Sequence, residues 1–154
     1  MENLSHSTFM QAAINSAKTS ISSGGIPIGS VLVHNNTIIG SGHNQRVQNG
    51  SAILHGEMDA LEKAGRLPAV TYKECTIYTT LSPCAMCTGA ILLFGIPRVV
   101  IGENHTFRGE EELLRNKGVE VIVMKNNECI NMMQIFIKNN PSIWYEDIGE
   151  IALI

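Results

Sequence analysis

Short β-rich runs and helical segments alternate along the second half of the chain, and this alternation most constrains the fold. The β-rich runs cover residues 75–80, 98–101 and 119–124, and helical patterns cover 83–94 and 110–117 between them. Parallel strands need crossover connections, usually helices, so the pattern predicts parallel strands with helices on both faces of the sheet.

The first half of the chain adds an antiparallel element to this prediction. Residues 28–34 and 37–42 are β-rich and are separated by Asn35-Asn36, a pair that tolerates positive φ, which indicates a hairpin. Together the five runs predict an α/β fold: a three-layer α/β/α arrangement with a central five-stranded mixed sheet.

Helical periodicity and turn residues define the remaining segments. Apolar residues recur every four positions from residue 9 to residue 21 and are followed by Gly24-Gly25, which predicts a helix over 5–23. A polar loop is expected over 44–52, and helices are expected over 54–65, 128–138 and 142–150. With 154 residues, no internal repeat and no linker, residues 1–154 are expected to form one domain.

The charge balance bears on partners and location. Eleven Lys and Arg against fourteen Asp and Glu give a net charge of -3, which argues against a nucleic-acid partner. The N-terminal residues do not resemble a signal peptide, and the apolar stretch 90–101 is interrupted by Pro97-Arg98 and too short to span a bilayer. We therefore expect a cytoplasmic protein that does not enter a membrane.

The cysteines divide into two groups. Four cysteines in a chain with an ample core do not suggest a disulfide framework. Cys75 and Cys129 have apolar neighbours and are interpreted as buried thiols. Cys84 and Cys87 are three residues apart, a spacing typical of a metal or redox site.

Two short motifs carry the chemistry: His55-Gly56-Glu57 and Pro83-Cys84-Ala85-Met86-Cys87. Each lies at the predicted start of a helix, where the helix N-terminus lowers the pKa of a thiol, and Pro83 suits the first turn. One His and two Cys provide three ligands for Zn²⁺ and leave the fourth tetrahedral position to water, which is the pattern of a catalytic site.

Glu57 is the candidate proton carrier of this site. Over the open first turn of a helix, His55 can bind the metal while Glu57 reaches the bound water. Burial beside two thiolates is expected to raise the pKa of Glu57 towards neutrality. The alternatives are a structural zinc and a thioredoxin-like redox pair, and the redox pair leaves the His-x-Glu motif without a role.

The combination His-x-Glu and Pro-Cys-x-x-Cys is the signature of zinc-dependent nucleobase deaminases. Five segments, at residues 24–29, 42–44, 50–57, 78–97 (YTTLSPCAMCTGAILLFGIP) and 144–150 (WYEDIGE), resemble the fungal-type cytosine deaminases. This resemblance implies the cytidine-deaminase-like form of the α/β/α fold, one Zn²⁺ per subunit, and a homodimer to which helix 88–94 contributes. It also implies hydrolysis of free cytosine to uracil and ammonia, with zinc-bound hydroxide attacking C4 and Glu57 moving the protons.

The resemblance assigns substrate contacts to six further residues: Asn44, Gly56, Ser82, Phe107, Trp144 and Asp147. Asn44 and the Gly56 backbone N–H would hold the ring and its 2-oxo group. Asp147 and the Ser82 carbonyl would accept hydrogen bonds from the 4-amino group. The two aromatic side chains would cover the base. Taken singly, Asn44 is also interpretable as a turn residue, Phe107 as core and Trp144 as a helix anchor.

Some positions depart from the pattern or carry no assigned role. Val47 stands where an aromatic residue is expected near the pocket, Ala85 stands where an acidic one is familiar, and residues 151–154 extend past the motif. Deamination of another small aminoheterocycle, such as guanine, a creatinine-like compound or a nucleoside, is the main alternative. Two further alternatives are a tRNA or single-stranded DNA deaminase and a non-enzymatic zinc protein. The run Glu110-Glu111-Glu112 is interpreted as a solvated helix start.

Overall fold

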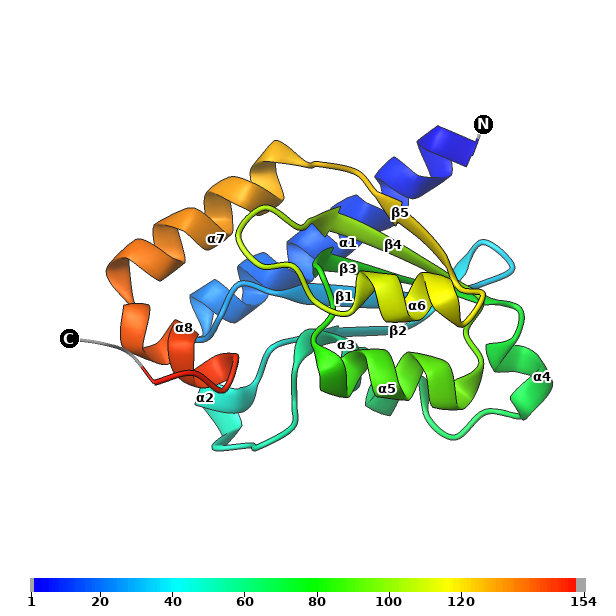
Figure 1. Cartoon of the computed structure of the whole chain (residues 1–154), viewed down its shortest axis with the longest axis horizontal. Coiled ribbons are helices and arrows are strands. Elements are labelled where there is room, and N and C mark those ends of the chain that lie inside the picture. Colours follow the sequence, from blue (N-terminus) through cyan, green and yellow to red (C-terminus); the bar gives the residue numbers. More distant parts are fainter. Residues whose placement is uncertain (1, 152–154) are drawn as a thin grey trace.

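The computed structural model describes residues 2–151, which form a five-stranded sheet flanked by helices (Figure 1). The strands are β1 (Gly29–His34), β2 (Thr37–His43), β3 (Cys75–Leu81), β4 (Arg98–Glu103) and β5 (Glu120–Val123), in the order β2-β1-β3-β4-β5. Strand β1 pairs antiparallel with β2 and β3, whereas β3, β4 and β5 pair in parallel. The predicted mixed sheet of five strands is confirmed.

Helices cover both faces of the sheet. Helices α1 (Glu2–Ser22) and α7 (Asn127–Asn139) pack on one face, and α3 (Gly56–Ala64), α5 (Ala85–Phe94) and α6 (Glu111–Asn116) pack on the other. Successive β4 residues alternate between the two cores: Val99 and Ile101 join the core under α3, α5 and α6, and Val100 joins the core under α1 and α7. The three-layer arrangement follows from strands that are apolar on both faces.

A third apolar cluster closes one end of the molecule. Helix α8 (Pro141–Asp147) brings Trp144 onto Ile28, the residue before β1, and Leu81 at the end of β3. Because β3 leads directly into the Cys84 motif, this cluster lies beside the predicted site.

Several predicted boundaries were wrong by a few residues. Helices α3 and α5 begin two residues later than predicted because His55 and Cys84, the residues before them, have extended backbones. Pro83 therefore precedes the N-cap instead of lying in the first turn. Helix α8 ends at Asp147, three residues before the predicted end, and Gly149 has a φ of 73°.

Two short helices were not predicted. Helix α2 (Arg46–Asn49) lies within the predicted polar loop and ends at Gly50, whose φ is 58°. Helix α4 (Ala69–Tyr72) leads into β3 and buries Tyr72 in the core. Each has four residues, too few to produce a recognisable apolar period.

The interpretation of Glu111 as a solvated residue was wrong. Its side chain is buried, with 1% exposed, whereas Glu110 and Glu112 are exposed. At the C-terminus, Ile151 is exposed, and the rest of the apolar extension lies outside the described residues. Between residues 2 and 151, no helix combines the length and apolar character needed to cross a membrane.

Candidate metal and active site

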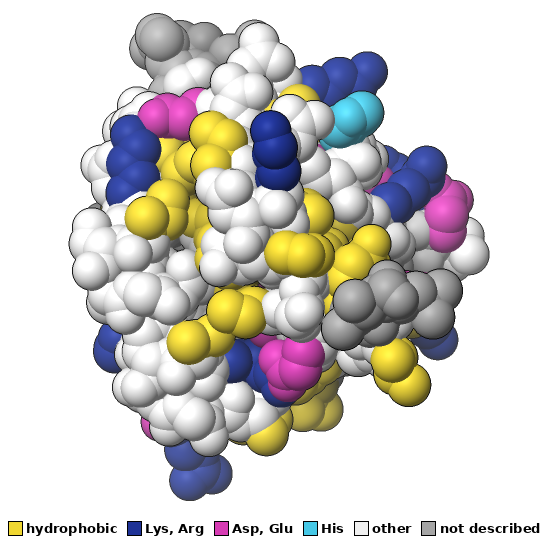
Figure 2. All heavy atoms as spheres, turned by 90° about the vertical axis from the view of Figure 1, so that its left-hand side faces the viewer, with side chains coloured by type: hydrophobic (Ala, Val, Ile, Leu, Met, Phe, Trp, Pro, Cys, Tyr) yellow, Lys and Arg dark blue, Asp and Glu magenta, His cyan; other side chains and the backbone are white. Residues whose placement is uncertain are grey.

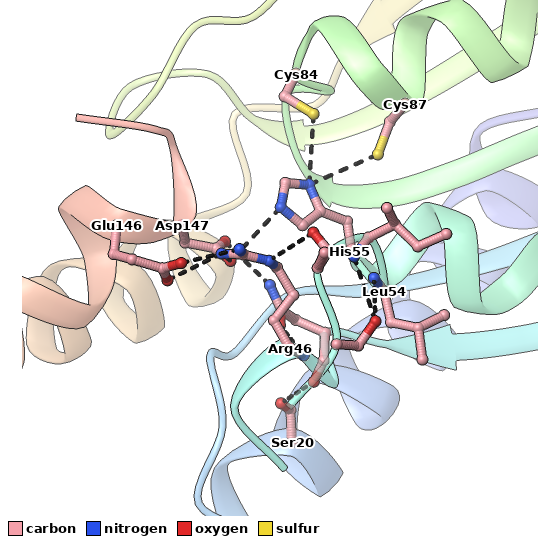
Figure 3. A network of polar contacts seen from close by, with 12 residues as sticks. Ser20, Arg46, Leu54, His55, Cys84, Cys87, Glu146 and Asp147 are labelled. Carbon is pink, nitrogen blue, oxygen red and sulfur yellow. Dashed lines mark hydrogen bonds and ion pairs between the residues drawn. The ribbon is translucent and has the colours of Figure 1, made fainter. Parts of the chain in front are cut away.

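Three potential metal donors converge at the N-termini of two helices. His55 is the N-cap of α3, Cys84 is the N-cap of α5, and Cys87 lies in the first turn of α5. The Nδ1 atom of His55 lies 3.4 Å from the Cys84 sulfur and 3.7 Å from the Cys87 sulfur (Figure 3). All three donor atoms lie within 4.8 Å of one another.

These separations fit a tetrahedral zinc ion. Zn–N and Zn–S bonds of about 2.0 and 2.3 Å at a tetrahedral angle place the nitrogen and sulfur about 3.5 Å apart. The observed distances of 3.4 and 3.7 Å bracket that value. A nitrogen and two sulfurs are also the donor types that zinc prefers, so the donor set fits zinc in both chemistry and spacing.

Cys84 is suited to bind a cation. A hydrogen bond from Cys87 and the neighbouring His55 lower the pKa of Cys84 to about 4, although burial opposes this. The pKa of Cys87 is raised, first by its hydrogen bond to Cys84 and then by burial. At neutral pH Cys84 is thus already a thiolate, and metal binding must displace the proton from the Cys87 thiol.

The second nitrogen of His55 faces a carboxylate. Its Nε2 atom lies 3.5 Å from Oδ1 of Asp147, on the side of the ring away from the sulfurs (Figure 3). Burial lowers the pKa of His55, but Asp147 and Cys84 outweigh burial and raise it to about 10. With this pKa both ring nitrogens carry a proton at neutral pH, so a metal must displace the proton on Nδ1, while the proton on Nε2 stays directed at Asp147, as is usual for metal-bound histidines.

Glu57 lies within the same cluster. Its side chain is buried, and burial raises the pKa of Glu57 to about 7, with His55 opposing and Cys84 adding to the effect. A carboxyl group with a pKa near neutrality can both accept and release a proton at physiological pH. Helix α3 positions it because His55 precedes the first turn and Glu57 lies within it.

A small cavity of about 20 Å³ adjoins the donors, with room for about one water molecule. Its walls are formed by Ile28, His55, Glu57, Leu81, Ser82, Cys84, Phe107, Trp144, Asp147 and Ile148. Phe107 and Trp144 pack edge to face, with ring centroids 6.0 Å apart. An open hollow of about 410 Å³ shares five of these residues with the cavity, so it gives access to the site from outside.

Asn44 is fixed on every side rather than being free in a loop. Its backbone N–H donates to the Ile28 carbonyl (2.9 Å), and its own carbonyl accepts from the Ser20 hydroxyl (2.8 Å). Its side-chain oxygen accepts from the Arg46 backbone N–H, and its amide nitrogen donates to Asp147, each at 3.0 Å. Asn44 therefore acts as a turn residue at the start of α2 and also contacts a predicted site residue.

The structure brings some predicted residues to the cavity wall and leaves others behind it. Ser82, Phe107, Trp144 and Asp147 line the cavity together with Glu57 and two of the donors, whereas Asn44 and Gly56 are buried but do not line it. Val47 borders an outer hollow beside Arg46, and Ala85 is exposed at the entrance. Neither of these two departures from the family pattern touches the inner cavity.

Arg46 is the residue that sequence reasoning missed. Its guanidinium donates to Asp147 Oδ1 at 3.0 Å and to both Glu146 oxygens at 2.9 Å (Figure 3). Burial raises the pKa of Asp147, but His55, Arg46 and Asn44 outweigh it and lower the pKa below its ordinary value. The partners of Arg46 in α8, Glu146 and Asp147, lie 100 and 101 residues further along the chain. The only sequence signal was therefore an arginine two residues after Asn44 and an acidic pair near the C-terminus.

Comparisons with known proteins agree with this site. A family model for the cytidine and deoxycytidylate deaminase zinc-binding region matches residues 4–103, which include all three donors and Glu57. The chain belongs to this family of zinc-binding deaminases. The predicted cytidine-deaminase-like fold and the zinc cofactor are thereby confirmed.

Individual relatives fall into two groups. The chain is 61% identical over 142 residues to a cytosine deaminase from Candida albicans, covering 92% of this chain and 95% of the relative. It is 37% identical over 140 residues to a tRNA-specific adenosine deaminase from Streptococcus pyogenes, covering 84% and 88%. A solved tRNA A34 deaminase superimposes with a TM-score of 0.69 at 23% identity, covering 82% of this chain and 99% of that one, which supports the fold.

Proposed function

We propose that this chain hydrolyses free cytosine to uracil and ammonia. The observation that carries the proposal is the small cavity at which Glu57 and Asp147 lie beside the His55, Cys84 and Cys87 donor set. The 61% identity to a cytosine deaminase over nearly the full length of both chains supports the same substrate.

The chain's own residues supply binding and proton transfer. Zinc, when bound by His55, Cys84 and Cys87, lowers the pKa of a water in its open position to about 7. Glu57 accepts the proton of the attacking water and delivers it to N3 of the ring; it then accepts the proton of the hydroxyl formed at C4 and passes it to the departing amine, which leaves as ammonia. Its raised pKa suits each of these transfers, since the group must be protonated and deprotonated twice in one turnover.

Asp147 is the proposed acceptor for the 4-amino group. A carboxylate offers about four acceptor positions, and Arg46, Asn44 and His55 already use three of them. The remaining position can accept one N–H of the substrate. The Ser82 carbonyl is the proposed second acceptor, and Asn44 and the Gly56 N–H are proposed to hold the 2-oxo side of the ring.

The aromatic residues around the cavity are proposed to cover the base. Phe107 and Trp144 come from different elements, a loop after β4 and helix α8, and meet over the cavity. The cavity holds about one water molecule, so side chains at its wall must shift towards the adjoining hollow to admit a pyrimidine. Closure then excludes water, which strengthens the polar contacts made to the substrate.

A free base fits these features better than a base within a polynucleotide. The 37% identity to a tRNA-specific relative favours the polynucleotide alternative. Against it, the end of the molecule that carries α7 and α8 has hydrophobic side chains across its middle, with basic and acidic side chains both around them (Figure 2). Tight RNA binding requires clustered positive charge, so the surface supports a small-molecule substrate.

The test is an ammonia-release assay with the zinc-loaded chain on cytosine, 5-methylcytosine, cytidine, guanine, adenine and creatinine. Glu57→Gln should retain one zinc per chain while turnover falls by at least about a hundredfold, because a general acid–base contributes 10²- to 10⁴-fold. Glu62→Gln, exposed on the same helix, is the matched control. Turnover of cytosine by Glu57→Gln at the wild-type rate would refute the assignment.

We also propose a homodimer and a reducing, cytoplasmic setting for a single deaminase domain spanning the chain. Ala85, Gly89 and Leu93 are exposed at four-residue intervals on α5, and Leu93 is 79% exposed, which supports an interface on this helix. The four cysteines are unpaired, and two of them are needed as thiolates, which supports a reducing compartment.

A further inference from the structure

A buried carboxylate lies just behind the cavity. Glu111, at the start of α6, accepts a hydrogen bond from the Ser82 hydroxyl at 2.6 Å and another from the Asn104 amide at 3.2 Å. Arg108 and Arg115 lie 3.9 and 3.8 Å from its Oε1 atom. Glu111 does not line the cavity, yet it binds a residue that does.

The Ser82 hydroxyl joins two segments of the chain. Besides donating to Glu111, it accepts from the Gly109 backbone N–H at 2.9 Å. Next to it, the Glu110 N–H donates to the Pro83 carbonyl at 3.1 Å. A Cβ atom on Gly109 would lie 1.8 Å from that carbonyl oxygen, so only glycine allows this close approach. The segment that leads into Cys84 is thus fastened to the loop before α6.

The same loop carries Phe107. Its beginning is held by Glu103, whose buried carboxylate accepts from the backbone N–H groups of His105 (2.7 Å) and Thr106 (2.9 Å) and from the Thr106 hydroxyl. Its end is held by Ser82 and Glu111. The loop is therefore anchored on both sides of Phe107 by buried carboxylates at the back of the site.

We propose that Glu111 is a positioning residue for deamination: through the Ser82 hydroxyl it fixes the Ser82 backbone and the Phe107 loop relative to Cys84. This inference rests on the proposed function, in which the Ser82 carbonyl accepts from the 4-amino group. A buried carboxylate is costly to desolvate and is retained only with several partners. Here one of those partners is Ser82, whose backbone carbonyl is the proposed acceptor for the departing amine.

Glu111→Gln tests the proposal, because it keeps the shape of the side chain and removes its charge. The amide nitrogen must then face either the Asn104 amide, which is also a donor, or the Ser82 hydroxyl, which would have to change from donor to acceptor. Either way the charge-assisted hydrogen bond that holds Ser82 is lost or weakened. A misplacement of about 1 Å in a catalytic site can cost about a hundredfold. We expect kcat/KM for cytosine to fall about ten- to a hundredfold, with one zinc per chain retained.

Glu112→Gln is the matched control. Glu112 is the next residue and pairs with the same two arginines, at 3.2 and 2.9 Å, but its side chain is 70% exposed and does not reach Ser82. This variant should remain within about twofold of wild type, as expected for a weak surface ion pair. An equal loss in both variants would show that the arginines, rather than the link to Ser82, matter.

A second measurement separates positioning from general damage to the fold. Pyrimidin-2-one is cytosine without its 4-amino group, so it does not use the Ser82 carbonyl. In Glu111→Gln we expect kcat for cytosine to fall at least tenfold while the inhibition constant of pyrimidin-2-one changes less than about threefold. A collapsed site would weaken both and would release zinc, which would overturn the proposal.

Ser82→Ala keeps the proposal testable if Glu111→Gln fails to fold. It removes only the hydroxyl, retains the backbone carbonyl, and should produce the same split between kcat and pyrimidin-2-one binding. Wild-type kcat/KM in either soluble variant would refute the positioning role. If the wild-type chain released no ammonia from cytosine, the proposed function would fail instead, and the Glu111 variants would be measured on whichever amine is turned over.

Discussion

Replacing Arg46 with alanine should loosen the C-terminal helix and its carboxylate. Arg46 contacts one buried partner, Asp147, whose side chain is 1% exposed, and one exposed partner, Glu146, at 64%. The exposed pair contributes about 0–1 kcal/mol. Breaking a buried pair costs about 3–5 kcal/mol, but Asn44 and His55 still contact Asp147, so we expect a loss of about 2–3 kcal/mol.

This loss should be visible in both stability and activity. For a chain of this length, about 2–3 kcal/mol lowers Tm by roughly 4–12 °C, measured by calorimetry on the zinc-loaded protein. If the same free energy is lost from the transition state, kcat/KM for cytosine falls by roughly 30- to 160-fold. Glu146→Gln removes only the exposed pair and should cost about 1 kcal/mol or less. The reasoning is refuted if Glu146→Gln is as damaging as Arg46→Ala, or if Arg46→Ala leaves both Tm and kcat/KM unchanged.

The effect of Arg46→Ala should also depend on pH. The pKa of Asp147 is lowered in the folded protein, so its ion pair stabilises the fold fully above the ordinary aspartate pKa of about 4. That stabilisation is lost as the pH falls through the lowered folded-state pKa. The difference in urea midpoint between wild type and Arg46→Ala should therefore shrink below about pH 4, and a difference that grew in acid would contradict the assignment.

Two further predictions concern the thiols and the packing of β1. After zinc is removed with a chelator, Cys84 should be the most rapidly alkylated thiol, because its pKa is about 4. Cys129 should stay unlabelled in peptide mass spectra, because burial raises its pKa to about 12. Rapid labelling of Cys129 in the folded chain would contradict its burial. Gly29→Ala should lower the free energy of unfolding, measured by urea titration, by several kcal/mol, because the new Cβ would lie 2.0 Å from the Ala13 carbonyl oxygen. Gly24→Ala, whose Cβ would meet nothing within 4 Å, should cost only about 1–2 kcal/mol for its φ of 85°. Equal costs in the two variants would refute the packing argument.

Local sequence patterns were sufficient for the order of the strands and of the longer helices, and for the potential metal donors. The strands were predictable because residues such as Val99, Val100 and Ile101 are apolar whichever face they point to, and a helix on each side is the arrangement that buries them all. The zinc ligands were predictable because His55, Cys84 and Cys87 each lie at or near a helix start, which local turn and apolar signals locate to within two residues.

The contacts behind the site depended on tertiary structure. Nothing local distinguishes Glu111 from the glutamates on either side of it, and only the packing of α6 against the Ser82 segment buries one of the three. In the same way, Arg46 lay in a stretch predicted to be a polar loop, and its role appears only when α8 returns to meet it.

The sequence by itself determined the α/β alternation, the three potential zinc donors and the candidate proton carrier Glu57, because each depends on residues close together in the chain or on apolar periodicity. Tertiary structure decided which carboxylates are buried and what they bind. Burial and ion pairing join residues 29 to 101 positions apart in the Ser82–Glu111 and Arg46–Asp147 contacts, and such pairings are set by how helices pack on the sheet.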